Sequence, residues 1–399
     1  MSQVICHVSC QSSTPGRASA LATTTFTALA GIGAAAAVIA SAHPAQAQTF
    51  AQAMDTLAGT ACSVGPCTSF GVAGGPGGQV EVPTGGQWPG ISQRLRELQC
   101  EAEKNASCLQ PGGAAADTMP FEGLNLFAST DYQNKNKDEA AEAGFNSNRA
   151  GFTIGLDSPM SWGVIGGALN YNYTAGDFDH NGGDFEQNSF GGLLYGSYYP
   201  SDSSFIDAVI GLAGKGYTID RTVVASLGAA PQILGKARGD TIGFEFQSSL
   251  SGGYDFTFDN FTIGPRAGIH YLRTDLSSFT ESGNTLALHY EDQVEDSLTS
   301  TLGFQGSVAI STSFGVVVPQ VNAEYVHEFL NDRRTIHASS NGTPVNFVTD
   351  PPDRDYFDVG GGVVFVLPDG ISPFLNYTAE VANRFEEVHT VTLGVRLEM

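Results

Sequence analysis

The sequence has 399 residues and a formal net charge of -23, yet charged residues make up only 15% of it. A soluble protein usually carries about a quarter charged residues, and nucleic-acid binding requires clustered Lys and Arg, which this acidic sequence lacks. The mean hydropathy of -0.05 and the single long apolar run exclude a bundle of membrane-spanning helices. A membrane protein built from alternating strands fits, because only one face of each strand is then apolar.

Residues 1–47 are predicted to form a secretory signal peptide. An apolar segment runs from Leu21 to Ala42 after a weakly basic stretch, and Ala45 and Ala47 supply the small residues of a cleavage site. The alternative is a single transmembrane helix. The Ala-rich centre of the segment and the cleavage site favour the signal peptide.

Export would leave four cysteines in an oxidising compartment, where disulfides form. They are Cys62, Cys67, Cys100 and Cys108. Of the three possible connectivities, two small local loops are favoured by the spacing. A zinc site is disfavoured because no histidine lies near either pair.

Residues 48–90 are rich in Gly and Pro and show little periodicity, so they are predicted to be an irregular exported segment. Residues 91–118 are predicted to form a helix followed by a linker. Ile91, Leu95 and Leu98 fall at helical spacing, with Arg94 and Arg96 on the remaining faces. An ordinary surface helix is one interpretation. Next to a barrel with a polar lumen, the helix could instead lie in the pore, with its arginines facing lumenal carboxylates.

Residues 119–399 are predicted to form one β-barrel. Twelve segments have the two-residue period of a strand with one apolar and one polar face. Charges keep to one face, as expected in a transmembrane barrel, because Arg on the lipid face near the midplane costs about 2–4 kcal/mol. The predicted strands begin near Glu122, Asn148, Trp162, Phe185, Ser204, Thr241, Phe261, Ser297, Ser313, Asp355, Gly370 and Val388.

The C-terminal strand has the most regular alternation in the sequence. Its polar face carries Thr392, Gly394, Arg396 and Glu398. Such a strand, ending at the last residue, is typical of the closing strand of a membrane barrel. Its apolar face carries Val391, Leu393, Val395, Leu397 and Met399.

Long and short connections alternate between the predicted strands. Outer-membrane barrels have this pattern, with tight turns on the periplasmic side and long loops outside. A Greek-key sandwich gives no reason for it. The predicted long connections include Gly176–Gly183, Thr218–Asp240, Leu276–Glu295 and Asn331–Arg354.

From Ile91 to Met399 the sequence resembles the β-barrel translocator domain of bacterial autotransporters, the type V secretion proteins. The resemblance implies a twelve-stranded antiparallel barrel in the outer membrane of a Gram-negative cell, with a helix in or near the pore. It also implies a passenger exported through or with the barrel, periplasmic chaperones, and a barrel-assembly machinery that recognises the terminal strand. The segments that carry it are Arg94–Cys100, Gly191–Pro200, Phe279–Gly283, Ser300–Gly303, Pro319–Phe329 and Asp350–Tyr356.

Two features depart from the family pattern. The family usually ends in an aromatic residue, whereas this sequence ends in Met399. A large passenger is usual, whereas residues 48–90 alone separate the predicted signal peptide from the predicted helix.

Motifs for catalysis and for metal or cofactor binding are absent from the sequence. It contains no nucleophile elbow and no phosphate-binding loop, and His327-Glu328 lacks the second histidine of a zinc-binding helix. We therefore expect a monomeric outer-membrane barrel, without enzymatic activity or cofactor, that anchors or translocates the N-terminal segment. The alternatives are a passive channel or an adhesin-like barrel acting through its outer loops, and, less favoured, a secreted soluble β-protein.

Overall fold

The computed structural model describes Ile91 and residues 123–138, 143–226, 231–349 and 353–398. Within these residues no helix has the length and apolar character needed to cross a membrane. Several predicted features lie outside the described residues and stay predictions. They are the signal peptide with Ala45 and Ala47, the four cysteines, helix positions Arg94, Leu95, Arg96 and Leu98, and the terminal Met399.

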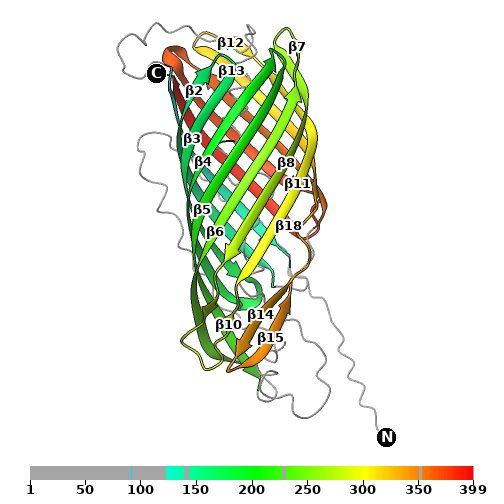
Figure 1. The fold of residues 1–399 in the computed structure, drawn as a ribbon. Coiled ribbons are helices and arrows are strands. Elements are labelled where there is room, and N and C mark those ends of the chain that lie inside the picture. The colour runs from blue at the N-terminus through cyan, green and yellow to red at the C-terminus, as the bar shows by residue number, and fades with distance from the viewer. Residues whose placement is uncertain (1–90, 92–122, 139–142, 227–230, 350–352, 399) are drawn as a thin grey trace, which may run out of the picture. The chain divides into compact units, whose positions relative to one another are not determined.

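Long antiparallel strands form a closed barrel (Figure 1). The first strand pairs with both the second and the last, so the sheet has no open edge. Two short strands, β7 (Phe256–Phe258) and β12 (Ile310–Thr312), extend neighbouring strands. The twelve barrel strands are β1 (Asn125–Lys137), β2 (Phe145–Met160), β3 (Gly163–Phe178), β4 (Gly183–Ser201), β5 (Ser204–Ser226), β6 (Pro231–Tyr254), β8 (Phe261–Leu276), β11 (Gln293–Val308), β13 (Gly315–Glu328), β16 (Asp355–Val366), β17 (Ile371–Val381) and β18 (Glu386–Glu398).

The all-β, twelve-stranded barrel predicted from the sequence is confirmed, and eleven of the predicted starts lie within a few residues of the observed ones. The exception is β6, which begins at Pro231 and not near Thr241. The connection Thr218–Asp240 was wrongly predicted to be a loop. There β5 and β6 continue as a hairpin, with Asp220 opposite Arg238. These two side chains form an ion pair at 3.2 Å. Because the two charges pair across the strands, β5 and β6 continue through these residues.

The two faces of the strands differ as predicted. Large apolar side chains point outward and stay exposed, for example Leu194 at 70% and Leu302 at 63%, whereas the inward-facing Thr153 is completely buried. A soluble protein would bury such leucines against a second layer. Their exposure around the barrel gives the apolar exterior that lipid requires.

The terminal strand β18 follows the predicted alternation. Val391, Leu393 and Leu397 are exposed on the outside of the barrel, while Thr392 and Arg396 are buried inside. Each residue of this strand up to Glu398 is paired with β1, so its register closes the barrel. Val395 lies at an outward position of the same alternation and is half-buried.

The two ends of the barrel are different. At one end neighbouring strands are joined by tight turns, as at Met160 and Gly163, and the C-terminus lies at this end (Figure 1). Here Trp162 and Tyr198 pack with ring centroids 6.4 Å apart and remain half exposed. This position suits the aromatic girdle at a membrane interface.

At the other end two of the connections predicted as long loops, Leu276–Glu295 and Asn331–Arg354, fold into a second sheet (Figure 1). Its strand order is β15-β14-β10-β9. Asn341 and Gly342 join two of the strands with φ of 48° and 81°, as in a tight hairpin turn that favours Asn-Gly. The strands are β9 (Phe279–Thr280), β10 (His289–Tyr290), β14 (Thr335–Ser340) and β15 (Thr343–Val348).

Candidate functional site

The lumen of the barrel is polar, and many of its charges are paired. The inward-facing Arg149 lies 3.3 Å from Asp131, and Lys215 forms an ion pair with Glu245. All four side chains are buried. Buried charges persist where they are paired and hydrogen-bonded, so the wall is adapted to polar contents.

One part of the wall carries a row of carboxylates on three adjacent strands. Glu324 on β13 lies opposite Asp358 on β16, and Asp358 lies opposite Glu380 on β17. Like charges directly opposite one another are unfavourable in a sheet. The row therefore places three carboxyl groups side by side on one part of the lumen wall.

Ile91 is the one residue of the predicted pore helix that the structure describes. It is only 2% exposed and belongs to an apolar cluster on the inner wall. The aromatic rings of Phe127 and Tyr195 in this cluster meet edge to face, with centroids 6.1 Å apart. The other members of the cluster are Val164, Ala168, Leu193 and Val209.

This cluster lies at the end of the barrel with the tight turns. Val164 follows the β2–β3 turn directly, and Phe127 is close to the start of β1. Two buried carboxylates lie close by. Asp157 accepts a hydrogen bond from Tyr195 at 2.8 Å, and Asp207 accepts one from Ser197 at 2.6 Å. The seat of Ile91 is thus an apolar patch beside two acidic groups.

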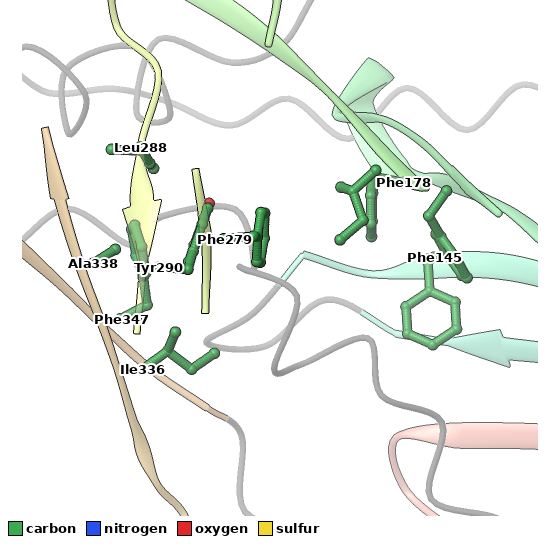
Figure 2. Packing of buried hydrophobic residues seen from close by; sticks show 10 residues of the cluster. Phe145, Phe178, Phe279, Leu288, Tyr290, Ile336, Ala338 and Phe347 are labelled. Atoms are coloured by element: carbon green, nitrogen blue, oxygen red, sulfur yellow. The ribbon is translucent and has the colours of Figure 1, made fainter. Parts of the chain in front are cut away.

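The opposite end of the lumen holds a second apolar cluster (Figure 2). Part of it comes from the wall and part from the two folded connections, which we call the outer cap (residues 277–292 and 329–349). These connections were predicted to be loops, and the outer cap was not predicted. The wall supplies Phe145, Phe178, Phe185 and Ile219, and the outer cap supplies Phe279, Leu288, Tyr290, Ile336, Ala338 and Phe347.

The motif His327-Glu328 does not form a metal site. Successive side chains of a strand point to opposite faces. The Nδ1 atom of His327 lies 2.7 Å from Asp355, whereas Glu328 is buried and accepts hydrogen bonds from Ser297 and the Leu298 amide. In the described part of the chain, no group of three or more His, Cys, Asp and Glu side chains could hold a metal ion.

A closed antiparallel barrel with an apolar exterior, a polar lumen, tight turns at one end and long connections at the other is a transmembrane barrel of the outer-membrane type. The family model described as "Autotransporter beta-domain" matches residues 126–378. The chain therefore belongs to the autotransporter β-domain family.

Solved structures share the fold. The translocator domain of the autotransporter NalP from Neisseria meningitidis aligns with a TM-score of 0.56 and 16% identity, covering 78% of this chain and 96% of that one. The β-domain of the Bordetella autotransporter BrkA aligns with a TM-score of 0.54 and 18% identity, covering 70% and 100%.

A curated relative from Pseudomonas putida, an uncharacterized protein in the trpE-trpG intergenic region, is 27% identical over 219 residues. The match covers 52% of this chain and 35% of the relative, so the chain spans about a third of the length of the curated relative it matches.

Membership of this family confirms the predicted outer-membrane location in a Gram-negative bacterium and the autotransporter role of the barrel. Barrels of this family are inserted by the cell's barrel-assembly machinery, and their translocator domains are not enzymes. The passive channel and the adhesin-like barrel are not favoured. The long connections, including the outer cap, face the cell exterior.

Proposed function

We propose that the barrel anchors residues 48–90 in the outer membrane and translocates them to the cell surface, and that it catalyses no reaction. The observation that supports this proposal most directly is the position of Ile91 against the inner wall, at the periplasmic end of the lumen. The chain that precedes the barrel would enter the lumen there.

Charge complementarity supports the same placement. Arg94 and Arg96 follow Ile91 within about one and a half turns of a helix. Asp157 and Asp207 are buried on the wall beside the seat of Ile91, and a buried carboxylate is stabilised by a nearby cation. We propose that the two arginines face these two carboxylates.

Photo-crosslinking from the barrel wall tests this placement. A photoreactive residue at Val209, which faces the lumen beside Ile91, should crosslink to an epitope-tagged segment around residues 85–98. The matched control is Ile210, the next residue along, which is 56% exposed on the outside of the barrel. We expect a crosslinked product, detected through the epitope tag, from position 209 and not from position 210.

A crosslink from both positions, or from neither in a correctly inserted barrel, would contradict a lumenal position for this segment. The predicted signal peptide, the two local disulfides, the monomeric state and the periplasmic chaperones remain proposals that this experiment does not address.

A further inference from the structure

We propose that the outer cap is a latched lid that closes the outer mouth of the barrel, and that the ion pair between Arg221 and Glu281 is its latch. The inference rests on the proposed function, because the lid would control the exit of the translocated segment. It concerns the opposite end of the lumen from Ile91, so the two can be tested separately.

The outer cap reaches from one wall of the barrel to the opposite one. Its two segments connect β8 to β11 and β13 to β16. They run beside the outer end of β6, where Ser282 pairs with Arg238, and share a buried apolar cluster with wall residues on β2, β3, β4 and β5. Around the barrel, β3 is separated from β11 by β4, β5, β6 and β8 on one side and by six strands on the other. The cluster that these walls and the cap share therefore extends over the mouth.

The wall residues of the apolar cluster point into the lumen, not toward lipid. Phe145 is on the same face of β2 as the buried Ser147 and Arg149. Phe185 packs against Phe145 and Phe178, with ring centroids 5.6 Å and 5.2 Å apart. Large apolar groups facing a polar lumen are favourable only when covered, and the outer cap covers them.

From the cap side, Tyr290 stacks on Phe279 with centroids 4.8 Å apart, and Phe347 lies 6.2 Å from Tyr290 (Figure 2). Tyr290 is 2% exposed, and its burial raises the pKa of the phenol. These rings give the lid an apolar inner surface, and Arg221 of the latch interacts with Tyr290.

The geometry of the Arg221–Glu281 pair is that of a specific, bidentate contact. Arg221 Nε donates to Glu281 Oε1 at 2.9 Å, and Nη2 donates to Oε2 at 2.6 Å. The same Nη2 donates to the Leu286 carbonyl at 3.1 Å, and the Leu288 amide donates to Glu281 Oε2 at 2.9 Å. Arg221 thus holds two points of the cap, Glu281 and Leu286, against β5, and Glu281 in turn binds Leu288 within the cap.

The outer cap is also fixed near its roots, to β6 and β11. The Thr241 hydroxyl donates to the Ser277 carbonyl at 2.8 Å, and Arg334 forms an ion pair with Glu295 at 2.7 Å. Contacts at the roots keep the cap attached when the latch is broken. Breaking the buried charge pair exposes two ions that need water, so the cap is expected to open as one unit.

Cysteine accessibility on intact cells tests the latch in the full chain. Ile219→Cys places a thiol on the wall beneath the cap, at a position that is 6% exposed. We expect slow reaction with a membrane-impermeant maleimide, and at least tenfold faster reaction when Glu281→Ala is added. Asp240→Ala, which changes a side chain that is 68% exposed, is the matched control and should leave the rate unchanged.

Two further variants keep the test decisive if Glu281→Ala assembles poorly. The charge swap R221E with E281R should restore slow labelling, and Arg221→Lys, which keeps the charge but loses the two-point contact, should give an intermediate rate. Fast labelling of the parent would overturn the lid, and equal rates in all assembled variants would overturn the latch. Neither outcome affects the crosslink from Val209, so failure of the lid and failure of the proposed function are distinguishable.

Discussion

Replacing Ile210 or Ile269 with arginine is expected to abolish assembly of the barrel in the outer membrane. Both side chains are on the outer face, at 56% and 45% exposure, where lipid tails surround them. An arginine near the midplane of the lipid face costs about 2–4 kcal/mol, a large part of the stability of a typical domain. The measurement is the folded, heat-modifiable band of the outer-membrane fraction in unboiled gels.

The neighbouring glycines provide matched controls for this prediction. Gly211 follows Ile210 and Gly268 precedes Ile269, and both glycines face the lumen. A side chain at Gly268 would meet Thr301 Oγ1 at 2.9 Å and His270 Nε2 at 3.2 Å, both atoms of side chains. Arginine at these glycines should be tolerated better. Equal loss of assembly at both faces would contradict the assignment of the lipid face.

Glu328→Ala is expected to lower the free energy of unfolding by about 3–5 kcal/mol, because it removes the acceptor of a buried hydrogen-bond network. Glu328 is 1% exposed and bonds the Ser297 hydroxyl. Its Oε1 accepts from the backbone amides of Leu298, Leu330 and Asn331 at 3.0, 2.9 and 3.1 Å. Urea-induced unfolding in lipid vesicles measures the change.

The matched control for this variant is Glu387→Ala. Glu387 is 67% exposed and pairs with His389 at 3.0 Å, so its removal should change the unfolding free energy by about 0.5 kcal/mol or less. If Glu328→Ala were as mild as Glu387→Ala, the network would not stabilise the root of the outer cap.

The barrel could be predicted from the sequence because its determinants are local. Alternation along a strand assigns each side chain to a face, and Leu393 is exposed as its position predicts, while the adjacent Thr392 is buried. Tight turns mark one end. The pattern failed at the hairpin of β5 and β6, where charged residues normally associated with loops instead form the cross-strand pair of Asp220 and Arg238.

The outer cap could not be predicted because its contacts are distant in sequence. β9 and β10 have two residues each, too few for periodicity to be detected. Arg221 and Glu281 are 60 positions apart, and no single-sequence pattern pairs them. One local signal was available, since Asn341-Gly342 between alternating apolar residues favours a hairpin, and β14 and β15 form that hairpin.

The candidate site was predicted only in part. A helix starting at Ile91 and lumenal carboxylates were both expected from the sequence, and the structure gives Ile91 a seat on the inner wall. The carboxylates beside that seat, Asp157 and Asp207, come from different strands. Only the closed barrel brings them together.

The most direct test of the account is protease accessibility of an epitope tag inserted near Gly75, measured on intact cells with outer-membrane fractionation as the control. The account predicts a barrel in the outer-membrane fraction and a tag that protease added outside removes. A correctly inserted barrel whose tag stays protected until the outer membrane is broken would contradict it, because residues 48–90 would then remain on the periplasmic side.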